Sequence, residues 1–291
     1  MSGHPHEHPL RFGLLLPNAG YYADARRLVD LARAAEESGW DGVFLWDHVM
    51  LDRRLRLPLA DTWTTVTAIL TSTRRIRCGP LVTPLASRHP WKVARETVTL
   101  DHLSDGRLVL GAGIGASADT DFLAFGDTAS VAERASRVDE ALAVIRRLWT
   151  GKEVSHAGER FLLDRVTFLP TPLRQPGVPV WIAATWPVRG RGALDRAARG
   201  DGVVPLVRDS AQGLRGPTPQ ELTEILAAVG STPAGWTVAI PGRTRVTDLA
   251  AARARIRDHH SRGATWWLES FDPWSRDPRE ALDWANHGPP R

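Results

Sequence analysis

The chain of 291 residues has a single cysteine, Cys78, and no apolar run long enough to cross a membrane. One cysteine excludes an internal disulfide and is typical of proteins kept in a reducing compartment. A transmembrane helix needs about 20 mostly apolar residues, so none is predicted. The first nine residues are polar and rich in histidine, without the apolar segment of a secretion signal. We therefore expect a cytoplasmic protein with a disordered tail over residues 1–9 and no membrane partner.

The sequence also lacks an excess of either charge and any concentrated basic segment. Its 37 basic and 33 acidic residues give a formal net charge of +4, and the arginines lie next to acidic residues in predicted helices. A nucleic-acid-binding protein is expected to carry a basic stripe. We therefore predict no nucleic-acid partner, although a few arginines suffice to bind an anionic cofactor.

No linker rich in serine and glycine, no internal repeat and no low-complexity tract divides the chain after residue 9. Hydrophobic residues make up 43% of the sequence and charged residues 24%, which is the composition of a soluble globule with a sizeable core. We expect residues 10–291 to form one domain.

Short apolar runs alternate with helical patterns along most of the chain. Eight runs are predicted to be buried parallel strands: Arg11–Pro17, Gly42–Trp46, Ile76–Thr83, Arg107–Gly113, Val180–Thr185, Gly202–Leu206, Trp236–Ile240 and Ala264–Glu269. Helical patterns lie between them, including Asp24–Ser38, a helix beginning near Asp61, Trp91–Leu103, Val131–Trp149, Pro219–Val229 and Thr247–Arg262. Eight such units predict an α/β fold, a closed (β/α)8 TIM barrel. Glu153–Phe168 is predicted to be a small β-insertion after the fourth strand.

The segment Leu108–Ala116 (LVLGAGIGA) matches the glycine pattern of dinucleotide-binding Rossmann folds. That fingerprint also requires a helix opening at the last small residue and an acidic residue that ends the next strand, about twenty residues on. Neither is evident here, and three βα units precede the motif. We interpret Gly111 and Gly113 as barrel-strand glycines that let the backbone approach a ligand. An NAD(P)-dependent Rossmann dehydrogenase remains the less favoured alternative.

The remaining chemistry-bearing residues are histidines and tryptophans. No nucleophile elbow is present, and the alternating histidines of the tail are not expected to form a metal site. Among the 12 tryptophans, most are expected to pack in the core. Trp266 and Trp267 are adjacent in a strand, so one should face the barrel interior and the other the helices. Four lie near strand ends and are candidates for an apolar substrate pocket: Trp46, Trp63, Trp91 and Trp186.

Six segments together resemble the luciferase-like monooxygenases, barrel enzymes that use FMN or the deazaflavin coenzyme F420. They lie in the family's order and cover nearly the whole chain: WDHV at 46–49, TRRIRCGPLVTP at 73–84, residues 88–115, RVDEALAVIRRLWTG at 137–151, residues 168–184 and DRAARGDGVV at 195–204. In the deazaflavin-using members an Asp–His pair ends the second strand, and the histidine contacts the reactive edge of the cofactor. The resemblance therefore implies catalytic roles for Asp47 and His48, although His48 could instead simply fasten a loop.

The resemblance also implies where a cofactor lies. The third strand of the family carries a bulge behind the ring, often with a non-proline cis peptide, here between Leu81 and Val82. The end of the fifth strand and the basic loop after it are expected to bind the cofactor phosphate. The implied cofactor-binding residues are Gly79, Leu81, Val82, Gly111, Gly113, Ala183, Ala184, Thr185, Arg189 and Arg191. The alternative for the arginine loop is that it is basic without binding phosphate.

Two departures from the family pattern bear on the substrate. Sugar-phosphate dehydrogenases of the family carry an acidic residue where this chain has Ile114, which puts that activity in doubt. The fifth strand ends in alanines where many relatives have glycines.

We therefore expect an oxidoreductase acting on a small organic substrate. With F420 the expected reaction is hydride transfer. With FMN it is oxygenation, and a separate flavin reductase then supplies the reduced FMN. The Trp-Asp-His sequence at the end of the second strand slightly favours F420. A barrel that binds a ligand without catalysis is the alternative. Family barrels commonly pair, so a homodimer is expected.

Overall fold

The computed structural model describes residues 9–51, 53–116, 118–128, 130–188, 190–209, 213–274 and 277–291. The first eight residues of the predicted tail and Arg189 lie outside the described residues. No described helix is long and apolar enough to cross a membrane.

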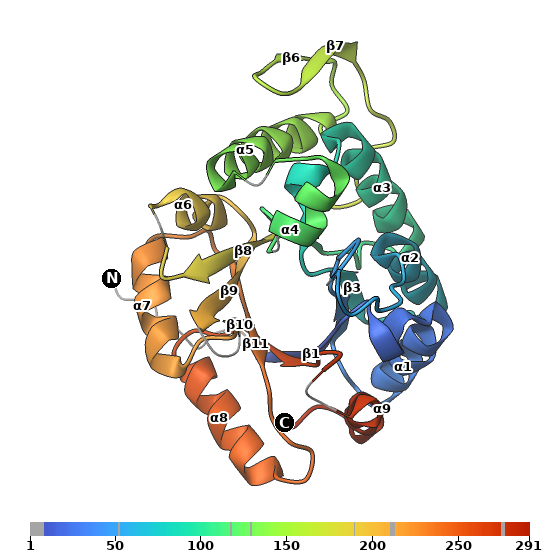
Figure 1. Ribbon diagram of the computed structural model, residues 1–291, viewed down its shortest axis with the longest axis vertical. Helices are drawn as coiled ribbons and strands as arrows, with labels where there is room; N and C mark the ends of the chain where they lie inside the picture. The colour runs from blue at the N-terminus through green and yellow to red at the C-terminus, as the bar shows by residue number, and fades with distance from the viewer. Residues whose placement is uncertain are drawn as a thin grey trace.

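Parallel strands form a barrel at the centre of the molecule (Figure 1). Their order is β3-β2-β1-β12-β11-β9-β8-β5-β4, and a parallel bridge between Cys78 and Leu108 joins the two ends of this path. The predicted TIM barrel is thereby confirmed, and the open Rossmann sheet is excluded. The barrel strands are β1 (Arg11–Leu16), β2 (Gly42–Leu45), β3 (Arg77–Pro80) with β4 (Thr83–Pro84), β5 (Leu110–Gly113), β8 (Val180–Trp186), β9 (Gly202–Asp209), β11 (Thr237–Gly242) and β12 (Trp266–Ser270).

Helices surround the strands as an outer ring (Figure 1). They are α1 (Ala25–Glu37), α2 (Thr62–Ser72), α3 (Pro90–Leu103), α5 (Val131–Leu148), α6 (Gly192–Ala198), α7 (Pro219–Val229), α8 (Leu249–Ser261) and α9 (Pro278–His287). Short helical turns lie in the loops: η1 (Gly20–Ala23), η2 (Leu85–Ser87), α4 (Ala118–Asp121) and η3 (Leu123–Phe125). The hairpin of β6 (Val154–Ala157) and β7 (Leu162–Val166) projects outside the ring (Figure 1). It confirms the predicted β-insertion after the fourth strand. β10 (Gly213–Arg215) pairs antiparallel with β9 and was not predicted.

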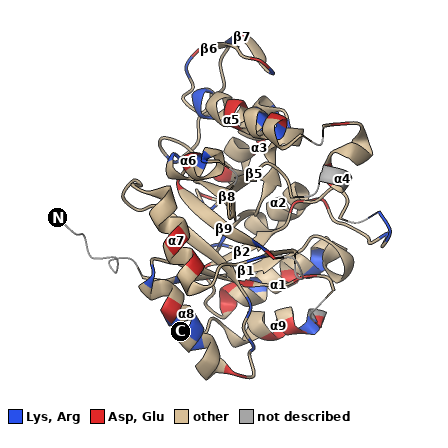
Figure 2. Ribbon diagram, turned by 60° about the vertical axis from the view of Figure 1, so that its left-hand side comes forward, with Lys and Arg blue, Asp and Glu red and all other residues tan. Residues whose placement is uncertain are grey.

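Local sequence accounts for these elements. β1 is buried from its second residue onward, as expected of a strand covered on both faces. Asp61 caps α2 by accepting a hydrogen bond from the backbone amide of Thr64 at 2.7 Å, which confirms the predicted helix start. Charged residues are spread over the helices without a single basic stripe (Figure 2).

The barrel interior is filled by side chains. Trp181 and Trp266 belong to this inner cluster, and both rings pack against Phe44 with centroids 5.3 and 5.7 Å away. Trp267 points the other way and packs against His259 of α8. The predicted division of the two adjacent tryptophans between barrel interior and helix layer is therefore correct.

The third barrel strand is interrupted. The prediction of one strand over residues 76–83 is corrected to two segments, β3 and β4, and the peptide bond between Leu81 and Val82 is cis. Just before the interruption, a Cβ atom at Gly79 would lie 1.8 Å from the carbonyl oxygen of Val109. Only glycine allows this approach, so the closure of the barrel depends on it.

Replacing Gly79 by alanine is expected to lower the free energy of unfolding by about 3 kcal/mol or more, because backbone atoms cannot move aside as a side chain can. Gly192→Ala in α6 is the matched control, since the atom nearest to the added Cβ lies 3.9 Å away. It should leave stability unchanged or raise it by up to about 1 kcal/mol. Urea-induced unfolding followed by circular dichroism measures both. Equal stability of the two variants would contradict this account of barrel closure.

Candidate active site

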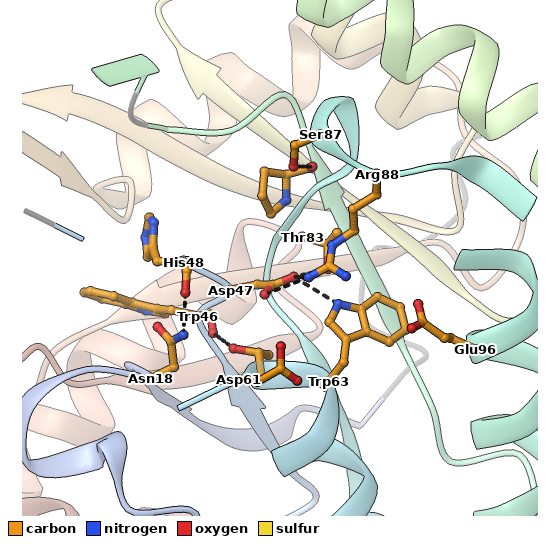
Figure 3. Close-up of polar contacts among 12 residues, drawn as sticks. Asn18, Trp46, Asp47, His48, Asp61, Trp63, Thr83, Ser87, Arg88 and Glu96 are labelled. Carbon is orange, nitrogen blue, oxygen red and sulfur yellow. Dashed lines mark hydrogen bonds and ion pairs between the residues drawn. The ribbon is translucent and has the colours of Figure 1, made fainter. Parts of the chain in front are cut away.

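The carboxyl end of β2 carries Trp46, Asp47 and His48. Successive side chains of an extended segment point to opposite sides, and Figure 3 shows Asp47 directed toward Trp63 and Arg88 while His48 is directed away from them. The two residues expected to act as a pair therefore face different surroundings.

The carboxylate of Asp47 is buried among three donors from later segments. Its Oδ2 accepts hydrogen bonds from the indole Nε1 of Trp63 at 3.0 Å and from the hydroxyl of Thr83 at 2.7 Å. The guanidinium of Arg88 forms an ion pair with the same oxygen at 3.1 Å. Only 5% of Asp47 is exposed. The carboxylate thus joins the end of β2 to α2, to β4 and to the loop before α3 (Figure 3).

The electrostatic balance at Asp47 follows from this burial. Burial raises the pKa of the Asp47 carboxyl, and Arg88 and the hydrogen bonds from Thr83 and Trp63 oppose that rise. Because its oxygens are engaged by interior donors, this carboxylate positions the strand end. The expected catalytic role of Asp47 stays a prediction.

The imidazole of His48 is held by a carboxylate that sequence reasoning missed. Its Nδ1 lies 3.2 Å from an oxygen of Asp121, the last residue of α4, and the Asp121 side chain is 2% exposed. The amide of Asn18 donates to the backbone oxygens of His48 at 2.8 Å and of Ala60 at 2.9 Å. Nε2 of His48 makes no hydrogen bond to any residue that the structure describes, and the side chain is 17% exposed. The ring is therefore oriented with one nitrogen available.

The loop from β5 to α5, which carries Asp121, is fastened by Arg134 of α5. Nη1 of Arg134 donates to the carbonyl oxygens of Ile114 at 3.2 Å and Gly115 at 3.0 Å. The guanidinium also lies 4.7 Å from the ring centre of Phe122. Arg134 is 3% exposed, and burial lowers its pKa. The irregular, polar sequence of this loop shows no periodicity, so nothing in it indicated that Asp121 reaches His48.

Three of the expected cofactor residues lie together at the strand ends. A Cβ atom on Gly113 would lie 3.0 Å from a methyl group of Val82 and 3.4 Å from the Cβ of Ala183. Gly113 thus lies between the ends of β4 and β8. Gly79 and Gly111 differ, because their missing side chains face backbone of neighbouring strands, Val109 for the first and Pro80 and Leu81 for the second. Strand packing alone accounts for these two glycines.

The expected phosphate-binding residues lie at the end of β8 and just after it. Ala184 is buried, whereas Ala183 and Thr185 are half-buried. Arg191 is 65% exposed and pairs with Asp195 at 3.1 Å. Phosphate binding by these residues stays a prediction, and Arg189 lies outside the described residues.

Of the four tryptophans expected to line a substrate pocket, only Trp46 packs against His48. It is half-buried, with ring centroids 6.1 Å apart. Trp63 is 5% exposed and its indole donates a hydrogen bond to Asp47, and its place in a substrate pocket stays a prediction.

Trp91 and Trp186 contact other parts of the structure, and their predicted place in a substrate pocket is likewise untested. Trp91 stacks on His89 and meets Phe161 of the hairpin edge-on, so its contacts are with the insertion. Trp186, half-buried at the end of β8, packs against the core between the barrel and the helices. Within the described ranges, no group of three or more His, Cys, Asp or Glu side chains is arranged to hold a metal ion.

Comparison with known proteins identifies one family of enzymes. The model of the luciferase-like monooxygenase family matches residues 10–288. An F420-dependent glucose-6-phosphate dehydrogenase of Nakamurella multipartita is 35% identical over 191 residues, which are 63% of this chain and 53% of that protein. An F420-dependent hydroxymycolic acid dehydrogenase of Mycobacterium tuberculosis is 33% identical over 204 residues, 68% of this chain and 53% of that protein. The matches thus span about half the length of these curated relatives.

Solved structures share the fold. An F420-dependent secondary alcohol dehydrogenase in complex with an F420-acetone adduct superposes with a TM-score of 0.76 at 19% identity, covering 94% of this chain and 96% of that one. The monooxygenase RslO1 from Streptomyces bottropensis gives a TM-score of 0.73 at 21% identity, with the same coverage.

Replacing Asp47 by alanine is expected to lower the free energy of unfolding by about 3–5 kcal/mol, because Arg88 loses its partner in a buried site. The control is Asp195→Ala, which removes a surface ion pair with Arg191 and should cost less than about 1 kcal/mol. Thermal unfolding at neutral pH compares them. Similar losses in both variants would show that Asp47 does not fasten the strand end.

Proposed function

The chain belongs to the luciferase-like monooxygenase family, and on that basis we propose that it transfers a hydride between coenzyme F420 and a small alcohol or carbonyl compound. The observation that carries the proposal is the imidazole of His48, oriented by Asp121 at the end of β2 and leaving Nε2 available. The curated relatives described above, whose names specify F420, support the choice of cofactor.

The role of His48 follows from its contacts. With the Asp121 carboxylate beside Nδ1, the proton of the neutral ring resides on Nδ1, and Nε2 carries the lone pair. Nε2 can then take the proton of a substrate hydroxyl, and in the reverse direction return it to the carbonyl oxygen. Asp121 acts as a positioning residue that holds the ring in this orientation.

The residues at the strand ends fit a flat, anionic cofactor. Gly113 packs closely between Val82 and Ala183, so no side chain of β5 projects from the surface that these three residues form. Arg191 is mostly exposed and has one surface partner, so its guanidinium is accessible to a phosphate. When bound, the deazaflavin supplies or accepts the hydride at the carbon that replaces flavin N5.

We infer that the substrate is not a sugar phosphate. Ile114 occupies the position where the sugar-phosphate dehydrogenases of the family carry an acidic residue, and its half-buried side chain packs against the core. Trp46 adds an apolar surface next to His48. A small alcohol with an apolar body suits these neighbours better than a sugar phosphate does.

FMN-dependent oxygenation is the second candidate, because similar folds occur in monooxygenases such as RslO1. That reaction would require reduced FMN from a separate flavin reductase. The two candidates differ in whether oxygen is consumed. A homodimer also stays a proposal, to be tested by the mass of the protein in solution.

The test is turnover of F420 under anaerobic conditions, followed by the loss of its visible absorbance with a series of secondary alcohols and with glucose 6-phosphate. We expect reduction with an alcohol and none with the sugar phosphate. Formation of an oxygenated product from reduced FMN, oxygen and an organic substrate, without any reduction of F420, would establish the monooxygenase instead.

Substitution of His48 by alanine is expected to lower kcat by about 10²–10⁴-fold, because the proton acceptor is lost. Asp121→Asn should lower kcat by about tenfold or more, with binding of F420 nearly unchanged, since it acts through His48. His102→Ala, on the exposed end of α3, is the matched control and should leave kcat unchanged. An unaltered kcat in the His48 variant would refute the proposed role.

A further inference from the structure

The floor of the barrel, opposite the end that carries His48, holds three arginines for which the proposed function has no use. Arg11 is the first residue of β1, Arg77 is the first of β3, and Arg174 lies in the loop before β8. Parallel strands place their first residues at the same end of a barrel, so the elements bring these side chains together.

A cavity opens among them. Its volume is about 400 Å³, and its walls include the three arginines together with Trp181, Trp236 and Trp266. A second hollow of about 640 Å³ adjoins it and shares Arg11, Arg77 and Trp266. Both volumes lie in the range of small-molecule sites.

The arginine side chains have no polar partners in the part of the chain that the structure describes. None of the three guanidinium groups forms an ion pair or hydrogen bond with a described residue, and Arg11 lies only over the ring of Trp266 at 5.7 Å. Arg11 is exposed, whereas Arg77 and Arg174 are half-buried. Buried or half-buried arginines are normally paired. Elsewhere in this chain they are, as Arg88 and Arg196 show with Asp47 and Asp139.

Two nearby carboxylates accept hydrogen bonds from backbone amides. Asp41 accepts a hydrogen bond from the amide of Phe12 at 2.9 Å, and Asp201 accepts one from the amide of Val180 at 2.9 Å. Both join neighbouring strands at this end of the barrel. Glu37, at the end of α1, lines only the second hollow. The described walls of the first cavity thus carry three arginines and one carboxylate, that of Asp201, which leaves an excess of positive charge.

The arginines affect one another. Burial, together with the charges of Arg174 and Arg11, lowers the pKa of Arg77 to about 10. A bound anion would offset both the repulsion and the loss of hydration.

We propose that this cavity is a second ligand site, which binds a small, soluble molecule carrying a phosphate group through Arg11, Arg77 and Arg174. Guanidinium groups match phosphate oxygens with paired hydrogen bonds. The half-buried ring of Trp236, anchored by a hydrogen bond to the backbone of Ala197 at 3.0 Å, gives the organic part of the molecule an apolar surface. A recessed cavity of this size suits a small molecule rather than a membrane or a nucleic acid.

The site is expected to stabilise the fold and not to take part in turnover. In TIM barrels, chemistry takes place at the carboxyl ends of the strands, whereas the amino ends serve stability. A ligand here would join β1, β3 and the loop before β8. This inference stands whether or not the proposed function is correct.

The test uses inorganic pyrophosphate as the probe. Thermal unfolding of the full chain is measured with millimolar pyrophosphate and with potassium chloride at equal ionic strength, and binding is measured by calorimetry. We expect pyrophosphate to raise Tm by about 5 °C at a hundredfold excess over its Kd, beyond any effect of chloride.

Arg77→Gln is expected to weaken pyrophosphate binding by about tenfold or more. The ligand-free variant should unfold at the same temperature as the parent or higher, because a repelled cation is removed. Arg26→Gln, an exposed arginine on α1, is the matched control and should bind pyrophosphate as the parent does. If Arg77→Gln does not fold, Arg174→Gln takes its place with the same expected result.

Three results would overturn the proposal. One is a shift in Tm no larger than that of chloride, and another is an equal loss of binding in the Arg26 variant. The third is sedimentation with anionic phospholipid vesicles in the absence of pyrophosphate binding, which would identify a membrane surface instead of a small-molecule site.

Discussion

The geometry of the candidate active site depends on one buried carboxylate. Asp47 accepts hydrogen bonds or an ion pair from Trp63, Thr83 and Arg88, which belong to α2, β4 and the loop before α3. A charge in so dry an environment is tolerated only when donors surround it. Because those donors come from three segments that are separate along the chain, Asp47 fastens the end of β2 to its neighbours (Figure 3). The next residue, His48, is thereby projected to the other side.

A second polar contact, between Asp121 and His48, orients the side chain that follows Asp47. Asp121 orients the imidazole of His48, and Arg134 in turn fastens the loop that carries Asp121 by binding the carbonyl oxygens of Ile114 and Gly115. The opposite end of the barrel shows the reverse situation, since Arg11, Arg77 and Arg174 face a cavity without partners among the described residues. The Asp47 carboxylate and Nδ1 of His48 thus have internal partners where a reaction is proposed, whereas the three guanidinium groups have none among the described residues where a ligand is proposed.

Much of the fold could be predicted from local sequence. The apolar run of β1, the Asp61 cap of α2 and the alternation of Trp266 and Trp267 all depend on neighbours in the chain. The resemblance to the family also indicated His48. The contacts that define the site are long-range, however, so the hydrophobic periodicity of the sequence does not predict them. Asp121 lies 73 positions from His48, and Trp63 was expected in a pocket because nothing local shows that its indole binds Asp47.

The most direct test of the account is an equilibrium titration of the purified chain with oxidised F420 and, separately, with oxidised FMN, followed by fluorescence. The account predicts micromolar or tighter binding of F420 and binding of FMN that is at least about tenfold weaker, a difference of about 1.4 kcal/mol. Tighter binding of FMN would contradict the choice of cofactor. If neither cofactor bound, the end of the barrel around His48 would not be the redox site proposed for it.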